Sequence, residues 1–97
     1  MNDNSIRKIL IEYLSASCDK IRIYQEKMIG SAVCDVMAVT DCLTGYEIKS
    51  DLDNYDRLER QVRAYRQFFD KNYLVVSTRH RASAPDKVPP EWVMSLS

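Results

Sequence analysis

Two carboxylates and one ammonium group are spaced so that they could share one site. Glu47 and Lys49 are two residues apart, and Asp35 precedes Glu47 by twelve residues. Because alternate residues of a β-strand project from the same face, Glu47 and Lys49 share a face if their segment is extended. If Asp35 lies on a neighbouring strand, both carboxylates can hold Mg²⁺ or Mn²⁺ beside Lys49. A metal held in this way activates water and stabilises charge on a phosphoryl group, which is the chemistry of phosphodiester hydrolysis.

The same three residues have a second interpretation. Opposite charges at cross-strand positions also form salt bridges on the half-exposed face of a sheet. Asp35 stands in an otherwise apolar run from Val33 to Val39, in which Cys34 is expected to be a small core residue. A buried carboxylate without a partner is costly, so Asp35 needs a cation or hydrogen bonds there. Spacing alone leaves both interpretations open.

Hydrophobic periodicity predicts the elements that must position these residues. Apolar residues recur at intervals of three and four over residues 5–17, which predicts an amphipathic helix. A second helix is predicted from about residue 54 to residue 70, with an apolar stripe formed by Leu58, Val62, Tyr65 and Phe69. Strands are predicted over 20–26, 33–40, 46–50 and 73–77, with turns at 30–31 and 41–45. This αβββαβ order predicts one α/β domain over residues 1–97, with a mixed sheet flanked by helices.

Two polar residues of the second predicted helix could reach the same site. Gln61 and Tyr65 are four residues apart, so they lie one above the other on one side of the helix. Gln61 falls at the margin of the apolar stripe that is expected to pack on the sheet. It therefore contacts either the carboxylate site or the backbone at the edge of the core.

These residues together carry a family resemblance. Asp35, then Glu47-Ile48-Lys49, then Gln61 and Tyr65 in a QxxxY element resemble the PD-(D/E)XK nuclease superfamily, which has the restriction-endonuclease-like fold. The QxxxY element is similar to the motif of its RecB-like exonuclease branch. The wider run GYEIKSDLDNYDRLERQVRAYRQFFDKNYLVVSTRH, with the later VPPEW, is similar to a group of small bacterial and phage-associated members. The similarity covers about residues 30–92.

The resemblance implies a metal-dependent nuclease that acts on DNA. It implies that Asp35, Glu47 and the Ile48 carbonyl bind Mg²⁺ or Mn²⁺, and that Lys49 is the catalytic lysine. Gln61 and Tyr65 are then supporting residues near the substrate. Glu26 matches an acidic position of the relatives, and it is either a further metal ligand or a solvated glutamate at the end of a strand.

Other features favour an alternative function. Close relatives carry a basic residue shortly before the aspartate, where this chain has Ser31, Ala32 and Val33. The formal net charge is zero, so no global basic field attracts nucleic acid. The alternative is a catalytically inactive nuclease-fold module that binds DNA or protein. A homodimer is a further expectation, because 97 residues offer little surface for a DNA cleft.

The remaining basic residues lie in two groups. The arginines at 57, 60, 63 and 66 form either a solvated helix surface paired with Asp56, Glu59 and Asp70, or a surface that contacts DNA. The Arg79-His80-Arg81 triplet follows the last predicted strand and could contact phosphates.

Composition excludes several classes of protein. Apolar residues make up 45% of the chain, and no run of them approaches the roughly 18 residues that a membrane-spanning helix needs. We therefore expect no membrane partner and a cytoplasmic location. The three cysteines lack CxxC spacing and accompany a single histidine, which makes a structural zinc site improbable.

Overall fold

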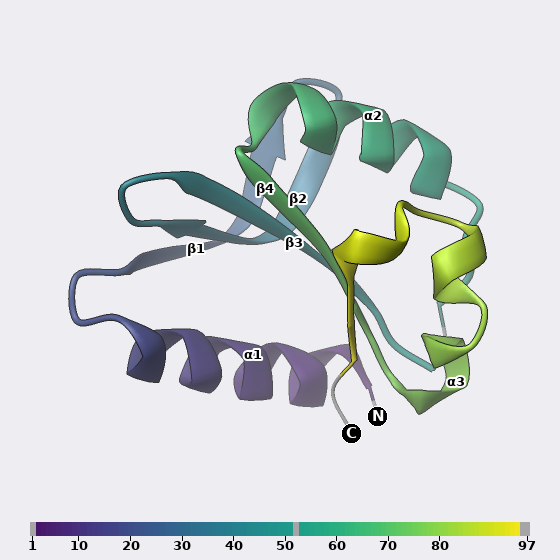
Figure 1. The fold of residues 1–97 in the computed structure, drawn as a ribbon, viewed down its shortest axis with the longest axis horizontal. Helices are drawn as coiled ribbons and strands as arrows, with labels where there is room; N and C mark the ends of the chain where they lie inside the picture. The colour runs from purple at the N-terminus through teal and green to yellow at the C-terminus, as the bar shows by residue number, and fades with distance from the viewer. Residues whose placement is uncertain (1, 52, 96–97) are drawn as a thin grey trace.

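One mixed sheet of five strands organises the fold, and helices cover both of its faces (Figure 1). The computed structural model describes residues 2–51 and 53–95. Along the chain the elements are α1 (Asp3–Ser17), β1 (Arg22–Ile29), β2 (Ala32–Val39), β3 (Leu43–Lys49), α2 (Leu58–Phe68), β4 (Lys71–Val76), α3 (Thr78–Arg81), the 3-10 turns η1 (Ala84–Asp86) and η2 (Pro90–Trp92), and β5 (Val93–Ser95). The predicted α/β class and the αβββαβ order are confirmed.

The strands lie side by side in the order in which they occur along the chain. β1, β2 and β3 pair antiparallel, whereas β3, β4 and β5 pair parallel. Parallel neighbours need a crossover connection, and α2 supplies it between β3 and β4. β5 extends the sheet beyond the strands that the sequence predicts, because three residues are too few to show an alternating pattern.

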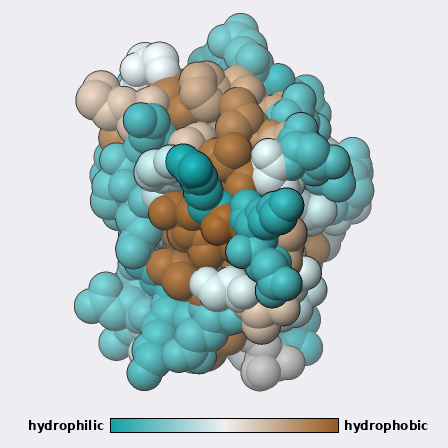
Figure 2. All heavy atoms as spheres, turned by 90° about the vertical axis from the view of Figure 1, so that its left-hand side faces the viewer, coloured by the Kyte–Doolittle hydropathy of each residue, from teal (hydrophilic) through white to brown (hydrophobic). Residues whose placement is uncertain are grey.

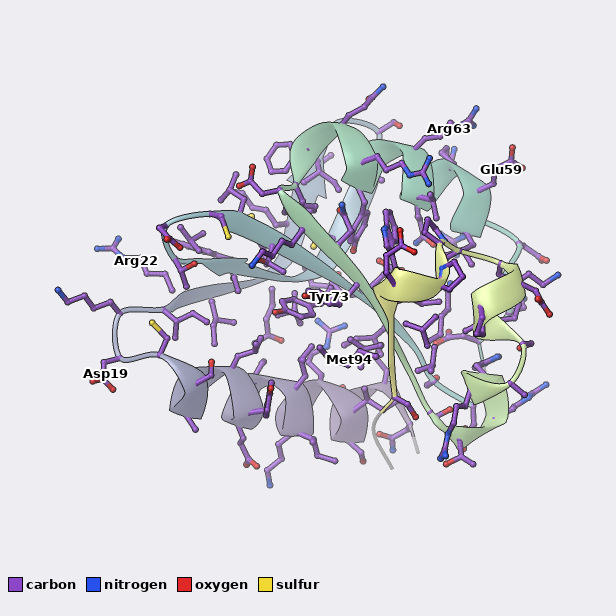
Figure 3. The ribbon with its side chains drawn as sticks, viewed as in Figure 1. Asp19, Arg22, Glu59, Arg63, Tyr73 and Met94 are labelled. Atoms are coloured by element: carbon purple, nitrogen blue, oxygen red, sulfur yellow. The ribbon has the colours of Figure 1, made fainter. Side chains whose placement is uncertain are left out.

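Two apolar layers hold the helices against the sheet. Ile6, Leu10 and Leu14 of α1 are buried on one face, where Figure 3 shows Tyr73 and Met94 between the sheet and this helix. On the other face, Tyr65 and Phe69 pack with Leu74 of β4 and with the segments that follow β4. α1 and α2 therefore lie on opposite sides of the sheet (Figure 1).

The first helix differs from its prediction at its start and in its apolar surface. α1 begins at Asp3, two residues earlier than expected, because the Asn2 side chain accepts a hydrogen bond from the Ser5 amide at 2.8 Å and caps the helix. Ile9 and Tyr13, which belong to the predicted apolar face, remain 40% and 62% exposed. On the side of the molecule drawn in Figure 2, apolar side chains reach the surface between α1 and the strands.

The second helix is shorter than predicted. Residues 55–57 form a bend and a turn, and the Asn54 side chain accepts a hydrogen bond from the Asp56 amide at 3.0 Å. This side-chain bond competes with a helical backbone, which explains why α2 starts only at Leu58. The helix ends at Phe68, because the Asp70 amide already bonds to the Leu43 carbonyl at 2.9 Å where β4 meets β3.

Strand boundaries move in two places that matter for the site. β1 runs to Ile29, so Glu26 lies inside this strand and not at its end. β3 begins at Leu43, inside the predicted turn at 41–45. Gly45 makes that extension possible, since a Cβ atom there would lie 2.4 Å from the Phe69 ring.

The sequence predicts that Cys34 is a small core residue, and the structure confirms this. Cys34 is fully buried, and burial raises the pKa of its thiol to about 11. None of the helices in the two described ranges has the length and apolar character that a membrane crossing requires.

The close contact at Gly45 gives a test of the packing. We expect Gly45→Ala to lower the free energy of unfolding by about 1–3 kcal/mol, because the added methyl group overlaps the Phe69 ring. Urea denaturation of the single variant and of Gly45→Ala combined with Phe69→Leu measures this effect. The smaller side chain should restore part of the loss, and an unchanged stability of Gly45→Ala would contradict the contact.

Candidate active site

The candidate site forms where β2 and β3 stop pairing. Their ladder ends at the pair Val36–Tyr46. Beyond this pair, the side chain of Asp35 replaces a backbone carbonyl as the hydrogen-bond acceptor. Its Oδ2 accepts a hydrogen bond from the Ile48 amide at 2.8 Å. The amide and carbonyl of a strand residue point to the same side, so the Ile48 carbonyl is also directed toward β2.

The strand is irregular at Asp35. Cys34 packs in the apolar layer on the α2 side, whereas Val36 packs in the layer on the α1 side. Residues two apart in a regular strand share a face, so the alternation is broken between them. The Asp35 side chain is left at this break, 18% exposed, between the two layers.

The neighbouring strand is irregular at the same level. The β1–β2 ladder has no pair between Glu26 and Asp35, and Glu26 adopts a left-handed backbone with φ of 53°. This conformation costs a non-glycine residue about 1–2 kcal/mol. Strain of this kind often occurs at functional sites, where surrounding contacts maintain it. The local distortion brings Glu26 to the same cavity as Asp35.

Both carboxylate oxygens of Glu47 accept hydrogen bonds from side chains of α2. The Tyr65 hydroxyl donates to Oε1 and the Gln61 amide nitrogen donates to Oε2, each at 2.7 Å. The Gln61 amide group therefore bonds to the carboxylate and not to the backbone at the core edge. The four-residue spacing on the helix lets both donors reach one carboxylate.

Burial shifts the protonation of the two carboxylates. Burial, followed by the charge of Asp35, raises the pKa of Glu47 to about 8, although the two hydrogen bonds and the charge of Lys49 lower it. Burial also raises the pKa of Asp35, against the Ile48 amide and the charge of Arg7. Two neighbouring carboxyl groups with raised pKa values lack sufficient compensating positive charge.

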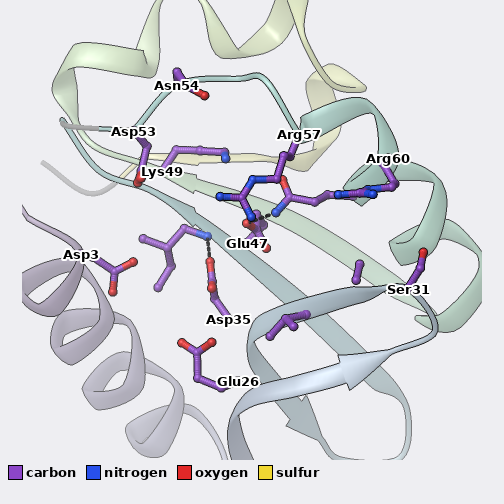
Figure 4. A pocket seen from close by; sticks show the side chains of 14 residues that line it. Asp3, Glu26, Ser31, Asp35, Glu47, Lys49, Asp53, Asn54, Arg57 and Arg60 are labelled. Carbon is purple, nitrogen blue, oxygen red and sulfur yellow. Dashed lines mark hydrogen bonds between the residues drawn. The ribbon is translucent and has the colours of Figure 1, made fainter.

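One cavity of about 440 Å³ unites these groups (Figure 4). The site residues that line it are Glu26, Asp35, Glu47, Ile48, Lys49 and Gln61. Tyr65 is buried behind Glu47 and reaches the cavity only through its hydrogen bond. Asp3, Asp53, Asn54, Arg57 and Arg60 also line the cavity, and the sequence did not single them out as parts of this site.

The surface salt-bridge interpretation is wrong. Glu47 and Lys49 are each only 7% exposed, so this part of β3 is not a half-exposed surface. Among the described residues, Lys49 forms no ion pair with Asp35 or Glu47.

Two sets of hydrogen bonds hold the loop at the end of β3: one within the loop itself and one from the segment that follows β4. The Asp53 carboxylate accepts hydrogen bonds from the Ser50 amide and hydroxyl at 2.7 and 2.9 Å. His80 is buried, with Nε2 at 2.8 Å from the Ser50 carbonyl, and Arg79 donates to the Asp51 carbonyl. His80 and Arg79 thus hold the loop beside Lys49, a role that the sequence did not indicate.

The predicted ion pairs of the α2 arginines are absent from the described part of the chain. None of the arginines at 57, 60, 63 and 66 forms an ion pair there with Asp56, Glu59 or Asp70. Asp70 instead accepts a hydrogen bond from the Leu43 amide at 2.7 Å. Arg66 lies over the Trp92 ring at 5.8 Å, while Arg57 and Arg60 line the cavity.

A comparison with known protein families identifies the chain. Residues 1–95 match the family model described as bacteriophage P4 protein cII. The chain belongs to this family. Comparisons with curated proteins and with solved structures gave no match. The expected phage relationship of this cII-family protein is thereby confirmed, and its relation to PD-(D/E)XK nucleases stays a prediction.

Sequence reasoning about the cII-family protein also missed Arg7. Its guanidinium lies 2.8 Å from Glu26 Oε1, 3.0 Å from Asp3 Oδ1 and 3.6 Å from Asp35 Oδ1. It also donates to the Asp35 carbonyl at 3.2 Å. Only the spacing of Asp3 and Arg7, four residues apart on α1, was a signal, and it indicates no more than a pair within the helix. Glu26 is thus 60% exposed yet paired, so it is not simply solvated.

Removal of Arg7 tests its part in holding the acidic groups. We expect Arg7→Met to lower the free energy of unfolding by roughly 1–3 kcal/mol, because Asp35 loses a charged partner in a largely buried position. Lys8→Met, an exposed position on the same helix, is the matched control. Urea denaturation at neutral pH that gives equal stabilities for the two variants would rule out this role.

The raised pKa of Glu47 predicts a pH-dependent difference between the protein and Glu47→Gln. The folded-state pKa of about 8 exceeds the ordinary value of 4.5, so between these values the folded state keeps a proton that the unfolded state loses. Glu47 therefore stabilises the fold at low pH, and this contribution is lost as pH rises toward 8, at up to about 1.4 kcal/mol per pH unit.

Urea denaturation in EDTA from pH 5 to pH 8.5 measures this effect. The stability of Glu47→Gln relative to the unmodified protein should increase with pH. A difference that stays constant over this range would show that Glu47 ionises at its ordinary pKa in the folded protein.

Proposed function

We propose that this cII-family protein is a metal-dependent nuclease that hydrolyses DNA phosphodiester bonds, with a site of the PD-(D/E)XK type. The observation that carries the proposal is the convergence of Asp35, Glu47 and Lys49 on one cavity. Glu47 is held there by Gln61 and Tyr65, the residues of the QxxxY element. The αβββαβ order of the fold supports the same assignment.

The donor set fits Mg²⁺ or Mn²⁺ at an open site. The described residues contain no group of three or more His, Cys, Asp and Glu side chains arranged to hold a metal. Mg²⁺ is usually held by one or two carboxylates together with water and substrate phosphate. Asp35 and Glu47 supply two carboxylates, and the Ile48 carbonyl is directed toward β2, the strand that carries Asp35. When bound, the metal would polarise the phosphate and lower the pKa of a water molecule.

Residues of the chain supply the remaining functions. Lys49 orients the attacking water or neutralises charge that develops on the phosphate. The buried amide oxygen of Gln61 has no hydrogen-bond partner among the described residues, so it can accept a hydrogen bond from a water molecule near Glu47. Arg57 and Arg60, on the cavity wall, contact the negative charge of the DNA backbone. Arg57 and Arg60 together substitute for the basic residue that the nuclease relatives carry shortly before the position of Asp35.

Incubation of single-stranded, duplex and branched DNA with Mg²⁺ or Mn²⁺ tests the proposal. We expect cleavage that EDTA abolishes, and a rate lowered about 100-fold or more in Lys49→Ala, because a charge at the reacting phosphate is lost. Lys8→Ala, an exposed lysine on α1, should cleave at the normal rate. Absence of metal-dependent cleavage, or equal cleavage by Lys49→Ala, would refute the nuclease.

Calorimetric titration with Mn²⁺ separates the nuclease from the inactive module. A nuclease requires Mn²⁺ binding that Asp35→Asn and Glu47→Gln each abolish. Absence of such binding would favour a nuclease-fold module that binds DNA or protein without cutting. The homodimer also stays a prediction, and light scattering of the purified protein tests it.

A further inference from the structure

A second hollow adjoins the candidate active site along α2. Its volume is about 400 Å³, and Ser31 and Arg60 line both cavities. One wall is the β1–β2 turn at Gly30–Ser31, and the other is α2. We call this hollow the α2 groove, and its lining includes Gly30, Ser31, Arg60, Arg63, Gln67 and Phe68. It leads from the carboxylates toward the C-terminal end of the helix.

The α2 groove carries unpaired positive charge. Arg60 and Arg63 are exposed, and neither forms an ion pair with another described residue. With about 3.6 residues per turn, Arg60, Arg63 and Gln67 lie on one side of α2. Glu59 lies four residues before Arg63 on the helix surface, but it does not line the groove and forms no ion pair with either arginine among the described residues.

An aromatic ring lies at the far end of the same groove. Phe68 is 45% exposed, although the adjacent Phe69 is buried, and the two rings meet edge to face at 5.0 Å. An exposed ring that is fixed in this way presents a flat apolar surface. Alternating positive charge and aromatic surface is the usual combination in proteins that bind single-stranded nucleic acid.

We propose that the α2 groove binds a segment of single-stranded DNA that enters the candidate active site, with Arg60 and Arg63 on its phosphates and Phe68 stacked on a base. The inference rests on the proposed function, because it supplies the strand that the site would cut. A volume of about 400 Å³ is in the range of small-ligand sites, which suits nucleotides of one strand. Stacking on Phe68 also requires an unpaired base.

The first test changes only charge at the turn. Gly30 has a φ of +64°, which Asn and Asp both tolerate, and a Cβ atom there would meet nothing within 4 Å. Gly30→Asp and Gly30→Asn therefore differ in charge at matched backbone cost. Fluorescence anisotropy with labelled oligo-dT, in EDTA so that no cleavage occurs, should show binding about fivefold weaker for Gly30→Asp than for Gly30→Asn. Equal affinities would overturn the proposal.

The second test measures the phosphate contact of Arg63. Figure 3 shows Arg63 on α2 and Arg22 at the opposite end of the molecule, so Arg22→Gln is the matched control for Arg63→Gln. For a single strand, the slope of log affinity against log salt should fall by about 0.7 when one phosphate contact is removed. The slope of Arg22→Gln should not change. An unchanged slope in Arg63→Gln would contradict a phosphate contact.

The third test measures stacking. Phe68→Ser should weaken binding of oligo-dT about fivefold or more, and it should not weaken binding of an abasic oligonucleotide to the same extent. Tyr13→Ser removes another exposed aromatic ring, on the far side of the sheet, and should bind normally. Equal losses with both oligonucleotides, or equal losses for a duplex of the same length, would refute the stacked single strand.

The nuclease activity and the single-strand binding by the α2 groove can be refuted independently of each other. Binding that responds to these changes without metal-dependent cleavage would retain the groove and reject the nuclease. Metal-dependent cleavage with normal binding by all three groove variants would retain the nuclease and reject the groove.

Discussion

The hydrogen bond from the Ile48 amide to the Asp35 carboxylate is the constraint on which the rest of the site depends. A sheet normally satisfies such an amide with a carbonyl of the neighbouring strand. Here a side chain accepts the hydrogen bond, so β2 can leave β3 without an unsatisfied donor in the core. The separation of the two strands creates the cavity, and it brings one carboxylate between the layers while Glu47 and Lys49 stay on the α2 side. If a backbone carbonyl of β2 accepted the hydrogen bond from the Ile48 amide instead, β2 and β3 would stay paired at this level.

Charge compensation is the second constraint, and it is incomplete. Asp35 has Arg7 as a partner on the α1 side, whereas the hydrogen bonds that Glu47 accepts from described residues come from the neutral donors Tyr65 and Gln61. Neutral donors stabilise a carboxylate less than a cation does, which is why burial still raises the pKa of Glu47. The cavity thus holds incompletely compensated acidic groups although the net charge of the chain is zero. Net charge describes the whole molecule, and it carries no information about a cavity that holds acidic groups on one wall and arginines on another.

Regular periodicity explains which parts of the site could be predicted. The alternation of β3 places Glu47 and Lys49 on one face, and the four-residue spacing on α2 brings Gln61 and Tyr65 to the same carboxylate. Departures from regular structure could not be predicted in this way. Nothing in the chain near Glu26 indicates a left-handed backbone, because the β1–β2 ladder is interrupted there only once β1 lies beside β2, and its ion-pair partner Arg7 comes from α1. Arg7 was missed for a similar reason, since its partners on β1 and β2 depend on how α1 lies across the sheet.

A rigid α2 links the orientation of Glu47 to the position of any strand in the α2 groove. Gln61 lies about 100° around the helix from Arg60, so adjacent residues serve the carboxylate and the groove. Tyr65 and Phe69 fix the helix in the core, and both are buried. A shift of α2 that moved the arginines relative to a phosphate would therefore also disturb the hydrogen bonds to Glu47. Packing of the helix, and not a contact between the arginines and the carboxylates, is what couples the two parts of the surface.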